Sequence, residues 1–261
     1  MLWKIHGSET FILGSVHLGD FDVVDTSKVI KAAFDRSETI VFEADLERAA
    51  AVAPAFLDLP DGQRLGDLVP APVYEITAQH WARLGLHGED LIRRKPSVAA
   101  AVLNFTQANR MGFVEQHGVD RPLWELALQL GKKREYLETP EYQFRRIFDG
   151  PMHEQVSILE DFAKKDDAGL AELVSLIVAW KNDDLNFLDE YVRERLERWP
   201  ATFNSLICQR NRDWAPKIAS MARRGKPTLV VIGALHLVGD QGVPSLLTNA
   251  GFALEKSEWP T

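Results

Sequence analysis

The sequence predicts an α/β (α+β) fold whose central mixed sheet is built from the two ends of the chain. Each end shows the same order of strand, loop, helix and strand, and the long middle is dominated by apolar residues at helical spacing. We therefore expect one domain over residues 1–261. In it, residues 1–50 and 225–261 form the sheet core, and residues 51–224 form a mainly helical insertion.

At the N-terminal end, the apolar runs Leu2–Ile5 and Thr10–Leu13 flank a turn that contains Gly7, which predicts a β-hairpin. The segment Ser27–Phe34 follows with its apolar residues on one helical face. The β-branched, apolar run Thr39–Glu43 then predicts a buried strand.

The middle of the chain shows a series of helical patterns and one interruption. The run Arg134–Glu138, which stops just before Pro140, predicts a short strand near residues 134–138. The expected helices are Asp67–Leu84, Pro96–Met111, Arg121–Leu130, Glu141–Phe148, Met152–Lys164, Leu170–Lys181, Leu185–Glu197 and Ala201–Arg223.

The C-terminal end repeats the order of the N-terminal end. Pro227–Ile232 predicts a buried strand, and Gly242–Asn249 predicts a short helix with Pro244 in its first turn. Gly251 is placed to end that helix, and Phe252–Glu255 is expected to form a last strand.

Composition excludes several classes of function. The net charge of −8 argues against binding to nucleic acid or to an anionic membrane surface. No run approaches the roughly 18 uninterrupted apolar residues of a membrane-spanning helix. The single cysteine, Cys208, cannot form an internal disulfide or a multi-cysteine metal site, which leaves histidine and carboxylate side chains as the plausible metal ligands.

Two loops of the same pattern lie at opposite ends of the chain. Gly14-Ser-Val-His17-Leu and Gly233-Ala-Leu-His236-Leu each follow an apolar strand, which resembles an internal duplication. Ligand sites of open α/β sheets form at the carboxyl ends of the strands, and glycine there lets the backbone turn sharply. A lone histidine is more often structural, but two in the same context favour a shared polar site.

Glu43 is the natural third member, because it ends a strand one crossover away from the first loop. A carboxylate in this position can simply cap a helix or pair with arginine. Histidine, histidine and glutamate also form a recurrent ligand set for divalent metals, and a carboxylate beside a metal can act as a general base. The sequence leaves open whether Glu43 binds a metal or acts as the base.

Residues in the middle of the chain are candidates for the outer part of this site. Asp120 precedes a predicted helix, where aspartate is also an ordinary N-cap. Glu138 ends the isolated strand and Gln143 lies on the next helix. Arg210 and Asn211 lie within a long helix, where the arginine stabilises an oxyanion, orients a carboxylate or forms a surface ion pair.

An ordered set of short motifs extends the pattern over nearly the whole chain: Leu13–His17, Val41–Glu43, Lys95-Pro96, Gly118–Asp120, Leu137–Gln143, Ala179-Trp180, Arg210-Asn211 and Gly233–Gly239. With these motifs the chain resembles the TraB/GumN family, which includes the Tiki metalloproteases and is distantly related to erythromycin esterases and ChaN-like proteins. The resemblance is closest to the bacterial GumN branch. It implies an α/β core with a helical insertion and a site made of two histidines, the strand-end glutamate and the arginine.

The resemblance also implies peptide-bond hydrolysis supported by a divalent cation, manganese or cobalt first and zinc next. The leading hypothesis is therefore a metal-dependent hydrolase acting on a peptide or small molecule. His17 and His236 would bind the metal, Glu43 would bind it or act as base, and Arg210 would stabilise the oxyanion. Asp120, Glu138, Asn211 and Gln143 would contact the substrate. The alternative is a binding protein without catalysis that holds a peptide, a small molecule or haem in the same pocket.

The N-terminus lacks the basic start, apolar run and small-residue cleavage site of a signal peptide. As the sequence stands we expect a cytoplasmic protein. If the chain is a trimmed mature form, as the resemblance to GumN-like proteins allows, it is extracytoplasmic.

Overall fold

The computed structural model describes residues 1–20, 27–164 and 168–257. The chain divides into two compact units. The sheet unit contains residues 1–45, 112–139 and 176–261, and the helical unit contains residues 46–111 and 140–175. Every residue of the polar site described below belongs to the sheet unit.

The sheet unit is built on six strands in the order β4-β3-β5-β2-β1-β6. β1 pairs antiparallel with β2 and β6, whereas the pairs β2–β5, β5–β3 and β3–β4 are parallel, so the expected central mixed sheet is confirmed. β2, β3 and β5 are buried almost throughout, which explains their continuous apolar sequence. The strands are β1 (Leu2–Ile5), β2 (Thr10–Ser15), β3 (Thr39–Phe42), β4 (Lys133–Tyr136), β5 (Thr228–Gly233) and β6 (Leu254–Lys256).

The two ends of the chain match in order but not in pairing. β2, α2 and β3 form one strand–helix–strand segment, and β5, α16 and β6 form the other. In both segments the two strands run parallel. β2 and β3 are each parallel to β5, and β6 is parallel to β2, and so to β5, because both are antiparallel to β1. The first crossover passes over one strand, β5, whereas the second passes over two, β2 and β1.

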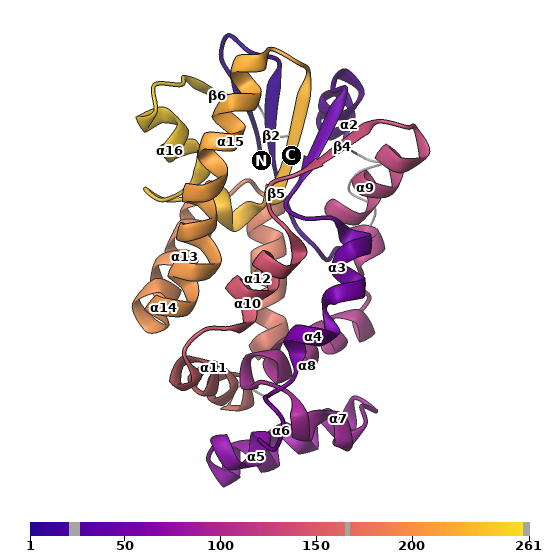
Figure 1. The fold of residues 1–261 in the computed structure, drawn as a ribbon, viewed down its shortest axis with the longest axis vertical. Coiled ribbons are helices and arrows are strands. Elements are labelled where there is room, and N and C mark those ends of the chain that lie inside the picture. The colour runs from indigo at the N-terminus through magenta and orange to yellow at the C-terminus, as the bar shows by residue number, and fades with distance from the viewer. Residues whose placement is uncertain (21–26, 165–167, 258–261) are drawn as a thin grey trace. The chain divides into compact units, whose positions relative to one another are not determined.

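Helices of the sheet unit pack on these strands. α15 lies against β5 and α16, and α9 lies against β3 and β4 (Figure 1). Ser27 caps α2 through its hydroxyl, and α15 ends at Gly225 in the left-handed conformation that favours glycine. The helices are α2 (Lys28–Arg36), η1 (Glu115–His117), α9 (Asp120–Gln129), α13 (Leu185–Arg198), α14 (Pro200–Phe203), the π-helical η2 (Asn204–Gln209), α15 (Arg210–Arg224), η3 (Ala234–Leu237) and α16 (Val243–Asn249).

The helical unit has its own apolar core, to which Leu65, Trp81, Leu103 and Leu159 contribute. Its helices are α3 (Leu46–Val52), α4 (Pro54–Leu57), α5 (Leu65–Leu68), α6 (Ala71–Arg83), α7 (Gly88–Arg93), α8 (Pro96–Arg110), α10 (Pro140–Phe148) and α11 (Met152–Lys164), and α12 (Ala168–Lys181) crosses into the sheet unit. Within the described ranges, no helix has the length and apolarity needed to cross a bilayer.

One expectation for this unit is corrected, and three of its short helices were not predicted. The helix predicted over Asp67–Leu84 is in fact two helices, α5 and α6, separated at Val69 and Pro70. The residue before a proline is disfavoured in the helical conformation, and Val69 is extended. The short helices α3, α4 and α7 were not predicted, because segments of four to seven residues hold too few apolar positions to show a period.

Candidate active site

The two Gly-x-x-His loops follow neighbouring parallel strands. β2 leads to His17 and β5 leads to His236, while β3, on the other side of β5, leads to Glu43. The backbone N–H of Glu138 donates to the carbonyl of Glu43, which continues the β3–β4 pairing beyond the strand ends. The backbone N–H of Gly233 donates to Oε1 of Glu43 at 2.7 Å. Parallel topology therefore gathers side chains from four strand ends at one edge of the sheet.

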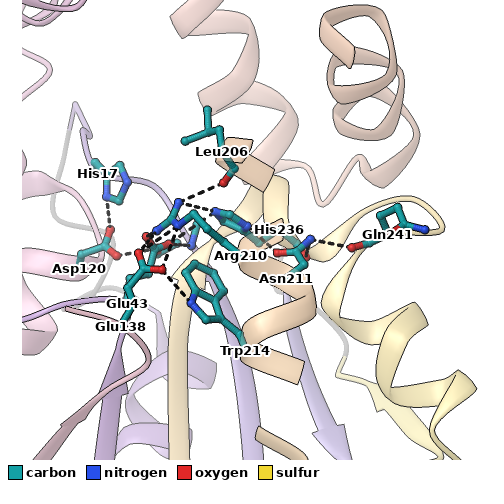
Figure 2. Close-up of polar contacts among 12 residues, drawn as sticks. His17, Glu43, Asp120, Glu138, Leu206, Arg210, Asn211, Trp214, His236 and Gln241 are labelled. Carbon is teal, nitrogen blue, oxygen red and sulfur yellow. Dashed lines mark hydrogen bonds and ion pairs between the residues drawn. The ribbon is translucent and has the colours of Figure 1, made fainter. Parts of the chain in front are cut away.

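Arg210 lies at the centre of this cluster, and its side chain is only 3% exposed. Nε donates to Glu138, and Nη2 donates to Glu138 at 2.7 Å and to Glu43 at 2.5 Å. Nη1 lies 3.1 Å from Nε2 of His236 and 3.3 Å from the carbonyl oxygen of Leu206 (Figure 2). A guanidinium has five N–H groups, and all five have a partner within the protein.

The helix that carries Arg210 changes its winding just before it. Residues Asn204–Gln209 are π-helical, and α15 starts at Arg210. Single π-helical turns within α-helices are frequent at functional sites. Here the carbonyl of Leu206, inside the π-helical segment, accepts the bond from Nη1 of Arg210. Trp214, one turn further along, stacks on the guanidinium, with Cζ of Arg210 4.4 Å from the ring centroid. Its Nε1 donates a hydrogen bond to Glu138 at 3.0 Å.

The protonation of His236 follows from its partners. The side-chain amide of Asn211 donates to the carbonyl of Gln241, so its Oδ1 is an acceptor. Nδ1 of His236 lies 2.6 Å from this oxygen and therefore carries the proton. Nε2 then bears a lone pair, which accepts a hydrogen bond from Nη1 of Arg210. Burial first, and the charge of Arg210 second, lower the pKa of His236 to about 3, so the ring is neutral at physiological pH.

His17 has the opposite character. Its Nδ1 lies 3.0 Å from Oδ2 of Asp120, whose other oxygen accepts from the hydroxyl of Ser15 at 2.8 Å. The side chain of His17 is 59% exposed, whereas that of Asp120 is 13% exposed. The charge of Asp120 is the main cause that raises the pKa of His17 to about 9, so this ring is a cation at neutral pH.

The two buried glutamates respond differently to the same arginine. Burial acts to raise the pKa of Glu43, but Arg210, with smaller contributions from His236, His17 and the backbone N–H of Gly233, outweighs burial and lowers the pKa to about 2. Glu43 is therefore ionised at neutral pH. For Glu138, burial outweighs the attraction of Arg210, and its pKa is raised above the usual value.

The loop of His17 is held from two sides. Trp180 donates from Nε1 to the carbonyl of Gly14 at 2.8 Å. On the other side, Val119 N–H donates to the carbonyl of Val16, next to Gly118. A Cβ on Gly118 would lie 2.3 Å from the carbonyl oxygen of His17, so only glycine lets these two backbones approach.

The model of the TraB/PrgY/gumN family matches residues 1–256. The chain belongs to this family. Two relatives, each named "Uncharacterized protein YbaP", come from Escherichia coli (strain K12) and Shigella flexneri. Each is 23% identical over 242 residues, which cover 90% of this chain and 86% of the relative. No solved structure matches the chain.

The family resemblance implied a metal, and the side chains as they lie do not fit one. Among residues 1–20, 27–164 and 168–257, no three or more histidine, cysteine, aspartate or glutamate side chains are placed to hold a metal ion. Arg210 is bonded to Nε2 of His236 and to Glu43, and Nε2 lies 4.0 Å from the nearer oxygen of Glu43. The ligand set of His17, Glu43 and His236 therefore stays a prediction that this arrangement does not support.

Most of the residues predicted for the site lie in the polar cluster around Arg210 (Figure 2): His17, Glu43, Asp120, Glu138, Arg210, Asn211 and His236. Gln143 lies on α10, in the helical unit. Asp120 is the first residue of α9, but its carboxylate binds Ser15 and His17 and makes no N-cap hydrogen bond with the helix.

Two members of the cluster, Ser15 and Trp214, were not predicted from the sequence. Both carried a usable signal. Ser15 lies two residues before His17 at the end of its strand, and Trp214 lies one helical turn after Arg210.

Proposed function

We propose that this chain is a hydrolase that cleaves an amide bond, with a peptide as its substrate. One observation carries the proposal. The exposed His17 is bonded to the less exposed Asp120, and this pair lies at the same edge of the sheet as the buried, ionised Glu43. The pKa values of about 9 for His17 and about 2 for Glu43 give a proton donor and a carboxylate acceptor at neutral pH.

The two groups have complementary tasks in this proposal. Water attacks the carbonyl carbon of the scissile bond, and its proton passes to the carboxylate of Glu43. Asp120 engages Nδ1 of His17, which leaves Nε2–H to face the substrate. This N–H donates its proton to the leaving nitrogen as the C–N bond breaks. Arg210 and the backbone N–H of Gly233 keep Glu43 in place, and His236 contacts Arg210 in turn.

The leading hypothesis had Arg210 stabilise the oxyanion, but its contacts favour the other role considered from the sequence, which is to orient a carboxylate. All five of its N–H groups are bonded to Glu43, Glu138, His236 and Leu206. In this proposal Arg210 fixes the carboxylates, and the charged ring of His17 faces the developing negative charge. The divalent cation implied by the resemblance has no step here, because Arg210 is bonded to two of its expected ligands.

The experiment is cleavage of a mixed peptide library, read by mass spectrometry, with manganese in one arm and a chelator in the other. We expect Glu43→Gln and His17→Gln each to lower the initial rate by about 100-fold or more. Glu38→Gln, at the opposite end of β3, and His6→Gln, in the exposed hairpin turn, are matched controls that should keep wild-type rates.

An undiminished rate in Glu43→Gln would overturn the proposed chemistry. Peptide binding by the wild type without cleavage in either arm would also overturn it, in favour of the binding protein without catalysis.

A further inference from the structure

We propose that the guanidinium of Arg210 is the resident cation of this site, and that a divalent metal binds there only when this guanidinium is removed. The inference concerns occupancy of the site and holds whether or not the chain cleaves peptides. It rests on three groups that converge on one side chain: the imidazole of His236 and the carboxylates of Glu43 and Glu138.

The one ring nitrogen of His236 that could bind a metal already accepts a hydrogen bond from Arg210. Nδ1 carries the proton that is shared with Asn211, so Nε2 is the only ring nitrogen able to bind a metal. A metal–nitrogen bond is about 2.0–2.1 Å long and lies along the lone pair of this nitrogen. Nη1 of Arg210 already donates a hydrogen bond to this lone pair at 3.1 Å. A metal and Nη1 therefore cannot occupy the space beside Nε2 at the same time.

The carboxylates of Glu43 and Glu138 are bonded to the same guanidinium. Oε2 of Glu43 lies 2.5 Å from Nη2 of Arg210, and Oε1 of Glu138 lies 2.7 Å from the same nitrogen. The other oxygen of Glu43 accepts from the backbone of Gly233, and the other oxygen of Glu138 accepts from Trp214. One guanidinium thus takes the coordinating positions of all three groups.

Arg210 is held firmly by its surroundings. Its five N–H groups all have partners, its face stacks on Trp214, and its side chain is 3% exposed. Moving it aside would leave the Glu138 side chain, 2% exposed, without its cation. A buried charge that loses its partner strongly destabilises the folded protein. Displacement of Arg210 by a metal is therefore opposed by the rest of the cluster.

Removing the guanidinium should turn the same residues into a metal site. Without it, His236, Glu43 and Glu138 face one vacated space with one neutral nitrogen and two carboxylates. Mixed imidazole and carboxylate sets of this kind bind divalent first-row metals. The orientation of His236 would be kept, because Asn211 still holds its Nδ1–H.

The test is calorimetric titration of the purified full chain with cobalt chloride, followed in parallel by the visible spectrum of Co²⁺. Arg210→Ala removes the cation, Arg210→Lys keeps a positive charge, and Arg212→Ala removes an exposed arginine two residues along the same helix. We expect wild type, Arg210→Lys and Arg212→Ala to bind Co²⁺ no more tightly than about 1 mM. Arg210→Ala should bind one Co²⁺ per chain at least about 100-fold more tightly, and adding His236→Ala should abolish that binding.

Two results would overturn the inference. One is tight binding of one Co²⁺ by the wild type that is lost in Glu43→Gln. The other is a folded Arg210→Ala chain, judged by circular dichroism, that gains no metal site. If Arg210→Ala does not fold, the wild-type titration decides alone: affinity no tighter than about 1 mM supports the inference, and tight binding lost in Glu43→Gln overturns it.

Discussion

Nη1 of Arg210 donates a hydrogen bond to Nε2 of His236 across 3.1 Å, and this contact separates the two histidines of the repeated motif in character. His236 is buried, neutral and an acceptor toward the arginine. His17 is exposed, charged and bonded to an acid. Loops of the same pattern thus hold one neutral ring that accepts a hydrogen bond and one protonated ring that is exposed to solvent.

The buried His236 should make the protein sensitive to mild acid. In the unfolded chain its ring takes up a proton below about pH 6.5, whereas in the folded chain its pKa is about 3. The unfolded state therefore binds more protons as the pH falls through this window, and the free energy of unfolding decreases. Between pH 6.5 and 5 the decrease should be about 2 kcal/mol.

Urea unfolding at a series of pH values measures this decrease. In His236→Gln this decrease between pH 6.5 and 5 should be lost, whereas His6→Gln, in the exposed turn, should keep the wild-type slope. Glu43 does not disturb this window, because its folded pKa of about 2 affects stability only below its ordinary value of 4.5. An equal slope in His236→Gln and wild type would contradict the assignment.

The pair formed by His17 and Asp120 should have the reverse dependence. The folded pKa of His17 is raised to about 9, so its contribution to stability is complete below its ordinary value of 6.5 and is lost as the pH rises through 9. Asp120→Asn removes the charge that is the main cause of this shift. We expect the pKa of His17 to fall toward its ordinary value, and the alkaline loss of stability to shrink with it.

Nuclear magnetic resonance of the imidazole Cε1–H measures the pKa of His17 directly. Glu115→Gln is the control, because this exposed acid lies in η1, shortly before Asp120 in the chain, and pairs with Arg121. It should leave the titration of His17 in place. A pKa for His17 that stays near 9 in Asp120→Asn would show that Asp120 is not its cause.

Much of the site could be predicted from the sequence because the strands order it. Apolar runs mark β2, β3 and β5, and parallel strands end at one edge, which is why His17, Glu43 and His236 could be grouped. The pairing of His17 with Asp120 could not be predicted, because the two residues are 103 positions apart and meet only where two loops cross. The π-helical turn before Arg210 also has no pattern that periodicity detects. The different characters of the histidines arise from tertiary partners that motifs of one pattern do not reveal.

The close crossing at Gly118 should be essential for placing His17. Gly118 has an ordinary negative φ of −73°, so alanine would not strain the backbone there. Its Cβ would instead lie 2.3 Å from the carbonyl oxygen of His17 and push the two loops apart. Gly118→Ala should therefore destabilise the fold and lower the pKa of His17, because its ring moves away from Asp120.

Gly88→Ala is the matched control, because a Cβ at Gly88 meets no atom within 4 Å. It should leave both the urea midpoint and the titration of His17 unchanged. If Gly118→Ala behaved like this control, the steric role of the crossing would be refuted.

Trp214 should stabilise the cluster through its indole N–H as well as through its ring. Nε1 donates to the buried carboxylate of Glu138 at 3.0 Å, and a phenylalanine keeps much of the stacking but not the donor. Hydrogen bonds to charged groups contribute about 1.5–3 kcal/mol, against about 0.5–1.5 kcal/mol for neutral pairs. Trp214→Phe should therefore cost more than Trp81→Phe, whose indole donates to the carbonyl of His87. Urea unfolding of the two variants tests the order. Equal losses would mean that Arg210 alone holds the charge of Glu138.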